Sequence, residues 1–126
     1  MDTSTFEALC APKAGVSASY PFGPDAHVFK VLDKMFALVA VGSAPLHVSL
    51  KCDPERALIL RETHPAIQPG YHLNKRHWNT LTLDGSLSDE LVRQLVDHSY
   101  ELVVRSLKKA ERERLGASSG RASAAP

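Results

Sequence analysis

The chain has 126 residues, the length of a single domain that buries a core without disulfides or a structural metal. Its 15 basic and 14 acidic residues leave a net charge of +1, so it lacks the overall basic excess of a protein that wraps DNA. A local basic patch is still compatible with that total.

Cysteine usage and apolar runs indicate the compartment. Cys10 and Cys52 form neither a CxxC pair nor a zinc-ligand spacing, and two distant thiols suit a reducing cytosol, each as a small buried side chain. The N-terminus lacks the layout of a signal peptide, and the longest apolar run, MFALVAV, is far too short to cross a membrane. We therefore expect a soluble, cytoplasmic, monomeric protein with no cofactor and no membrane partner.

The N-terminal part predicts a short helix followed by irregular chain. Residues 3–11 suit a helix with Thr3 or Ser4 as its N-cap. The next segment, SASYPFGPDA at 17–26, predicts a loop or a short, interrupted edge strand, because two prolines and a glycine punctuate it.

Three strands are predicted next. Alternating polar and apolar residues indicate strands at 27–32 and 46–52. Between them, residues 35–41 are apolar on both faces, which is typical of a central strand covered on both sides. Asp33 and Lys34 are expected to form the two-residue turn that joins the first two strands.

A second helix and two further strands follow. Asp53 as N-cap with Pro54 at the first helical position is a strong start signal, and the helix ends before Pro65. Strands are then predicted around 71–73 and at 78–83, with a turn between them.

The last predicted element is a long helix, capped by Ser86 or Ser88. Its apolar stripe has a period near 3.6 and comprises Leu91, Val92, Leu95, Val96, Leu102, Val103 and Leu107. Basic residues crowd its C-terminal end, namely Lys108, Lys109, Arg112 and Arg114. We therefore predict one domain over 1–115 and a disordered tail over 116–126.

Together these elements predict an α+β fold, a two-layer sandwich with a mostly antiparallel sheet and helices on one face. The helices are N-terminal, middle and long C-terminal, and no internal repeat is present.

The run PGYHLNKRHWNTLTLDGSL at 69–87 concentrates the residues that carry chemistry. His72 and His77 are five residues apart, with no HxxxH or CxxC spacing and no acidic ligand nearby, so no metal site is predicted. The letters Asp97-His98-Ser99 read like a catalytic triad. On a helix successive side chains point about 100° apart, so these three form no relay and no catalytic residue is predicted.

Within that run, YHLNKRHW interleaves bases with aromatic rings, the mixture that combines phosphate contacts with base stacking. Lys75 and Arg76 would then lie at a hairpin tip. The alternative is that Tyr71 and Trp78 anchor strands in the core while Lys75 and Arg76 are ordinary solvated turn residues.

Several motifs together resemble the MmcQ/YjbR family of small bacterial proteins over about residues 3–108. The motifs are YPFG, VFKV, MFAL, VSLK, PGYHLNKRHWNTL, DGSL and DHSYELV. The resemblance implies a CyaY-like (frataxin-type) sandwich, DNA binding through a double-wing arrangement of the sheet, and no enzyme activity. It does not imply the iron binding of frataxins, because the first helix offers only Asp2 and Glu7.

The leading hypothesis is therefore a non-enzymatic DNA-binding module. Its expected contact residues are Lys75, Arg76, His77, Asn74, Lys30 and Lys51. If their strands are neighbours, Lys30 and Lys51 share one sheet face with the turn at 74–77. The alternative is a protein-interaction or small-ligand-binding domain, with a pocket lined by Tyr20, Phe22, His72 and Trp78.

Overall fold

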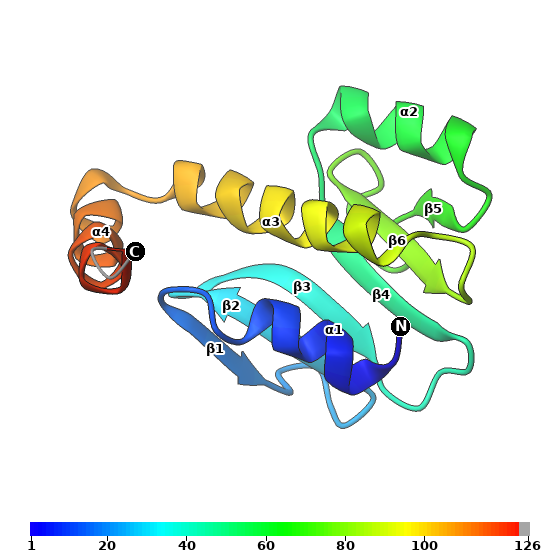
Figure 1. The fold of residues 1–126 in the computed structure, drawn as a ribbon, viewed down its shortest axis with the longest axis horizontal. Coiled ribbons are helices and arrows are strands. Elements are labelled where there is room, and N and C mark those ends of the chain that lie inside the picture. Colours follow the sequence, from blue (N-terminus) through cyan, green and yellow to red (C-terminus); the bar gives the residue numbers. More distant parts are fainter. Residues whose placement is uncertain (124–126) are drawn as a thin grey trace.

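Six antiparallel strands form one sheet in the order β1-β2-β3-β4-β6-β5 (Figure 1). This computed structural model describes the backbone of residues 1–123 and the side chains of residues 1–116. The strands are β1 (Val16–Ser19), β2 (Ala26–Val31), β3 (Lys34–Ala40), β4 (Leu46–Lys51), β5 (Ile67–Pro69) and β6 (Trp78–Leu83). The predicted α+β fold with an antiparallel sheet is confirmed.

Within residues 1–123, four helices accompany the sheet: α1 (Thr3–Cys10), α2 (Pro54–Thr63), α3 (Asp89–Ser106) and α4 (Lys109–Ser123). Helices α1 and α3 cover the same face of the sheet, α2 lies beside β5, and α4 lies at the far end of α3 (Figure 1). Helix α4 packs through Leu115 against Gly15, where a Cβ atom would come within 2.3 Å of the leucine Cδ2.

The core lies between the sheet and its helices. Its fully buried members come from every layer, including Phe6, Phe36, Val48, Leu81 and Val96. Ser99 joins α3 to two strands at once, because its hydroxyl donates to the carbonyl of Phe36 (2.6 Å) and accepts from the N–H of Lys51 (2.9 Å).

The capping signals of the two later helices are confirmed. The side chain of Asp53 accepts from the N–H of Arg56 at the start of α2, and α2 ends at Thr63, before the proline. Ser88 caps α3 by accepting from the N–H of Leu91. These are local interactions between residues three positions apart, which is why the sequence predicts them well.

Two local predictions near the N-terminus are wrong. The N-cap of α1 is Asp2, whose carboxylate accepts from the N–H of Thr5, and Thr3 is already helical. The first hairpin turns at Leu32 and Asp33, one position early, and Lys34 begins β3. Leu32 adopts a left-handed φ of 53°, and its N–H donates to the carbonyl of Gly15, so a tertiary contact accompanies an unusual turn residue.

The strand predicted around 71–73 is absent from the described chain, and β5 at Ile67–Pro69 pairs with β6 instead. Gly70 still donates to the carbonyl of Trp78, and the chain then leaves the sheet with His72 in the left-handed region (φ 59°).

The long C-terminal helix is broken. Helix α3 ends at Ser106, and Leu107 is extended (φ −72°, ψ 156°) and buried. The hydroxyl of Ser106 donates to the carbonyl of Val103, a local bond that competes with helix continuation. Helix α4 then runs to Ser123, so the backbone is helical where the tail was predicted to begin, and 124–126 lie outside the described residues.

The most consequential difference concerns β3. Its side facing the helices is buried, as Phe36 and Val39 show, whereas Leu38 and Ala40 are only half-buried. Among the described helices, none covers this second side of the strand, so the prediction of a strand covered on both sides is wrong. This uncovered side positions the candidate site.

Candidate nucleic-acid interface

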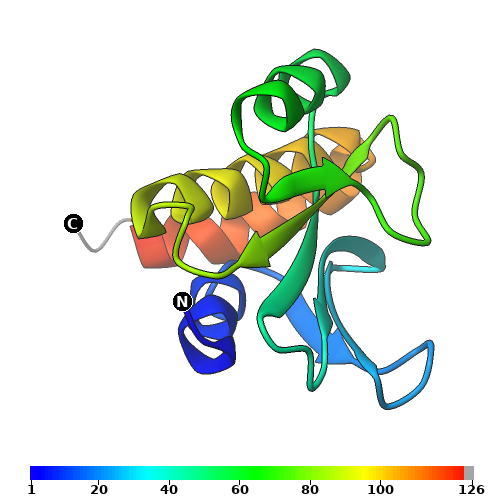
Figure 2. The same ribbon diagram turned by 90° about the vertical axis from the view of Figure 1, so that its right-hand side faces the viewer.

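The sheet face opposite α1 and α3, here called the open face, follows from the strand register. Val28, Leu38, Ser49, Thr80 and Gln68 are paired directly in a row across five strands. Directly paired residues point to the same face, so this row and its alternate neighbours form one surface. Figure 2 shows α1 on one side of the sheet, while the loops after β1 (blue) and after β5 (yellow-green) project to the other.

The strands that form the open face carry no carboxylates. Within residues 1–123, no strand contains an Asp or a Glu. The register between β2 and β3 shifts between Phe29 and Lys30, but the pairing of β2 with β1 is unbroken and places Lys30 on the same face as Val28. The pairing of β4 with β6 likewise places Lys51 on the same face as Ser49, so both lysines lie on the open face. Strands β2 and β4 run in the same direction with β3 between them, so both lysines lie at one end of the sheet, about 10 Å apart.

A concavity of about 460 Å³ lies on the open face beside these lysines. Its lining contains no Lys, Arg, Asp or Glu and comprises Leu38, Ala40, His47, Ser49, Gln68, Pro69, Tyr71, Thr80 and Thr82. Of these nine residues, sequence reasoning connected only Tyr71 with a site, as part of the run YHLNKRHW, and it assigned none of the other eight. One signal in the sequence could have pointed to them. Side chains alternate between the two faces of a strand, so the apolar run at 35–41 places apolar residues on both faces of the sheet.

Hydrogen bonds order the polar part of this lining. The hydroxyls of Ser49 and Thr80 are 2.8 Å apart, and Thr80 Oγ1 also accepts from the N–H of Tyr71 at 2.9 Å. The amide nitrogen of Gln68 donates to the carbonyl of Pro65 at 2.9 Å, and no described residue hydrogen-bonds to its Oε1. The concavity therefore presents neutral donors and acceptors in defined positions.

The loop over 70–77 is held by Arg61 of α2. The guanidinium donates through Nε to Asn79 Oδ1 (2.6 Å) and through Nη2 to the carbonyls of Trp78 (3.2 Å) and Lys75. These bonds fix Lys75 and the C-terminal end of the loop to α2, and the N–H of Gly70 closes the N-terminal end onto the carbonyl of Trp78.

Two of the predicted contact residues serve this loop. Asn74 Oδ1 accepts from the N–H groups of Arg76 (2.9 Å) and His77 (3.2 Å). Lys75 Nζ donates to the carbonyl of Gly70 at 3.0 Å. The side chain of His77 is half-buried, and its carbonyl accepts from Cys52.

The structure divides the predicted DNA-contact residues into two groups. Lys30 and Lys51 share the open face, whereas Lys75 and Arg76 border a separate hollow against α2. Pro54, Glu55, Leu58 and Arg61 complete the lining of that second hollow. Both loop residues are exposed, but the ammonium group of Lys75 already donates to the carbonyl of Gly70.

The residues expected to line a ligand pocket are not brought together. Trp78 is 8% exposed beneath Gly70, where a Cβ atom would lie 2.7 Å from the tryptophan Cβ. Tyr20 stacks on His27 (centroids 4.5 Å apart), which in turn bonds Glu7 of α1 on the helix side of the sheet. Phe22 and His72 are exposed in two different loops.

The three letters that read like a triad point to three separate partners, as helix geometry predicted. Asp97 pairs with Lys13 (2.5 Å), His98 Nε2 accepts from the N–H of Asp53 (3.1 Å), and Ser99 joins α3 to the strands. Burial, followed by the nearby Arg56, lowers the pKa of His98.

The two cysteines are free and buried, as expected. Burial raises the pKa of Cys10 to about 12 and that of Cys52 to about 11, so neither is a thiolate nucleophile near neutral pH. Among the described side chains, no three His, Cys, Asp or Glu gather as ligands of one metal ion. Over the described residues, no helix has the length and apolar character that a membrane span requires.

The YjbR family model matches residues 12–102. The chain belongs to the YjbR family. It is 40% identical to the uncharacterised protein YjbR of Escherichia coli K12 over 115 residues, covering 91% of this chain and 98% of the relative. It is 37% identical to the uncharacterised protein YbdF of Escherichia coli O157:H7 over 100 residues, covering 79% of this chain and 82% of that one.

Solved structures agree with this assignment. The crystal structure of Deinococcus radiodurans protein DR2400, domain DUF419, matches with a TM-score of 0.84 and 44% identity, covering 90% of this chain and 86% of that one. A Pseudomonas syringae protein matches with a TM-score of 0.69 and 29% identity, covering 81% and 98%. The resemblance to the MmcQ/YjbR family is therefore confirmed, and it establishes the family and the fold.

Proposed function

We propose that this YjbR-family protein is a monomeric, non-enzymatic DNA-binding module that uses the open face of its sheet. The observation that carries the proposal is the separation of charge. All 14 acidic residues of the chain lie outside the strands, whereas Lys30 and Lys51 lie together on the open face. Strands that carry lysines and no carboxylates favour a locally positive surface, which attracts a polyanion even when the whole protein is close to neutral.

Two lysines and one exposed arginine suit contacts with the phosphate backbone. Lys30 and Lys51 are about two strand spacings apart, and Lys51 is paired with Trp78, at the base of the loop that carries Arg76. Contacts of this kind position a nucleic acid without reading its bases, and they release counterions on binding.

The salt dependence of binding tests the proposal. Fluorescence anisotropy with a labelled single strand and its duplex, between about 50 and about 200 mM salt, should show affinity that falls steeply with salt. The double variant Lys30→Ala with Lys51→Ala should reduce the slope of log K against log salt by about one and a half units, since two phosphate contacts are lost.

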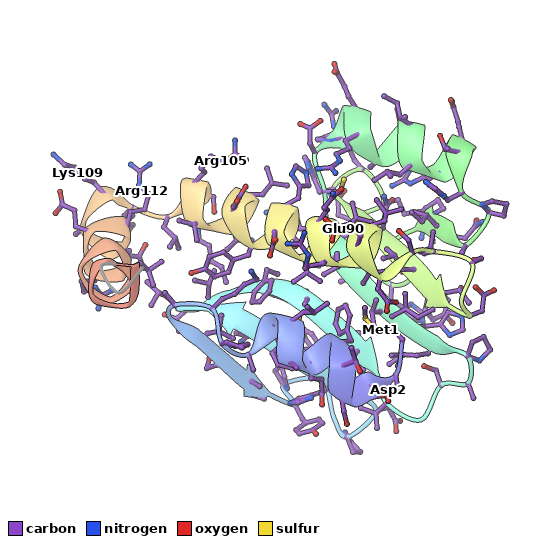
Figure 3. The ribbon with its side chains drawn as sticks, in the orientation of Figure 1. Met1, Asp2, Glu90, Arg105, Lys109 and Arg112 are labelled. Atoms are coloured by element: carbon purple, nitrogen blue, oxygen red, sulfur yellow. The ribbon has the colours of Figure 1, made fainter. Side chains whose placement is uncertain are left out.

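The matched control is Lys108→Ala with Lys109→Ala, which also removes two exposed lysines. These lie at the α3–α4 junction, where Figure 3 shows Lys109 with Arg105 and Arg112 pointing outward at one end of the molecule. The control variant should keep the slope. Absence of binding to either oligonucleotide at low salt, or an equal loss of slope in the control, contradicts the proposal.

A further inference from the structure

The floor of the open-face concavity is apolar although no described helix covers it. Leu38 and Ala40 of β3 line it, and next to them Val28 is fully buried on the same side of the sheet. Apolar side chains with part of their surface in water gain free energy when a flat, weakly hydrated group covers them.

The rim of the concavity is polar and carries no Lys, Arg, Asp or Glu. Gln68 offers an amide oxygen that no described residue engages, and His47 and Thr82 contribute an imidazole and a hydroxyl. A phosphate group would meet no cation here, whereas a nucleobase is uncharged and carries donors and acceptors on its edge. The lining therefore matches a base better than a phosphate.

Tyr71 lines the same concavity while remaining 71% exposed. Its backbone N–H is fixed to Thr80 Oγ1 at 2.9 Å, and its ring lies 4.0 Å from the ring of His72. An aromatic residue that is anchored through its backbone and mostly exposed is suited to stacking on an unpaired base.

Phosphate contacts are available on the same surface at a suitable distance. Ser49, which lines the concavity, and Lys51 both point to the open face of β4, two residues apart, so the lysine lies about 7 Å along the strand from the edge of the concavity. A base inside a duplex is stacked on both sides and paired, so it cannot enter the concavity without being extruded.

We infer that the preferred ligand is single-stranded DNA, with one unpaired base held in the open-face concavity against Tyr71 and its backbone directed toward Lys51 and Lys30. This inference rests on the proposed function and names the substrate class for the same face.

The test uses the full chain and two labelled probes, a 12-nucleotide oligodeoxythymidylate and its duplex with oligodeoxyadenylate. The single strand should bind at least tenfold more tightly than the duplex. Tyr71→Ala should weaken single-strand binding by about tenfold, the loss expected for one base stack, whereas Tyr71→Phe should retain binding. Ala40→Leu should weaken it similarly, because the larger side chain fills the floor.

Two controls separate this site from a general surface effect. Phe22→Ala removes a ring that is also exposed (67%) but belongs to another loop, and Ala18→Leu adds the same bulk on edge strand β1. Both should bind the single strand like the original protein, and all variants should keep its unfolding temperature within a few degrees.

The outcomes distinguish the two proposals. The base site is overturned if duplex and single strand bind equally and neither Tyr71→Ala nor Ala40→Leu weakens binding. If the double variant Lys30→Ala with Lys51→Ala still reduces the salt slope in that case, the proposed DNA binding stands. Binding of neither probe overturns the proposed function together with this inference. Equal losses in the Phe22→Ala or Ala18→Leu controls also overturn the base site, because the effect is then not specific to the concavity.

Discussion

The two faces of the sheet are built from the same strands but differ in how far their apolar side chains are buried. On the covered face, Phe36 and Val39 of β3 are sealed beneath the helices. On the open face, Leu38 and Ala40 of the same strand are apolar as well, yet they line a concavity. The comparison shows that apolar character along a strand does not by itself mean burial. One face contributes stability, and the other is available for recognition.

The largest expected effect is the difference in stability lost when an apolar residue is truncated on the covered face and on the open face. Phe36→Ala should lower the free energy of unfolding by about 3–5 kcal/mol, because it leaves a cavity in the sealed core. Leu38→Ala should cost about 1 kcal/mol, since its surroundings are already open to water. Urea unfolding followed by circular dichroism measures both, and similar losses would mean that the faces are equally sealed.

A smaller effect concerns the hydroxyl groups. Ser99→Ala removes the partner of two backbone groups, the carbonyl of Phe36 and the N–H of Lys51, and should cost about 1–3 kcal/mol. Ser49→Ala removes one bond to Thr80, which still accepts from the N–H of Tyr71, so the cost should be about 1 kcal/mol or less. Chemical denaturation checks the order, and a larger loss at Ser49 would contradict it.

The smallest effect is a pH dependence on the covered side, where His98 accepts from the N–H of Asp53. Burial lowers the pKa of His98 in the folded protein, so the unfolded chain binds the proton more readily. Its contribution to stability is therefore present above a pH of about 6.5 and declines as the pH falls toward the lower folded value.

His98→Gln should flatten that decline in urea titrations between about pH 7.5 and about pH 5. The control is His72→Asn, which removes an exposed histidine at a left-handed position that asparagine tolerates, and should leave the decline unchanged. An identical pH profile in His98→Gln and the original protein would assign the decline to other groups.

The sequence by itself determined the elements whose signals are local. Asp53 with Pro54 begins α2 and Ser88 begins α3, because each cap bonds to a residue three positions away. Alternation determined the strands around Lys30 and Lys51, and a series of short motifs determined the family. The part of the candidate site that the sequence could predict is the position of those two lysines on one face, because side chains alternate along a strand.

Tertiary structure decided which apolar face is covered, and therefore where the site lies. Helix α3 can cover only one side of β3, and nothing in the apolar run at 35–41 says that the other side stays open. Contacts from another element also decided the loop at 70–77, since Arg61 of α2 binds the carbonyls of Lys75 and Trp78. Periodicity reports what a side chain prefers, whereas packing between distant segments decides which preferences are satisfied.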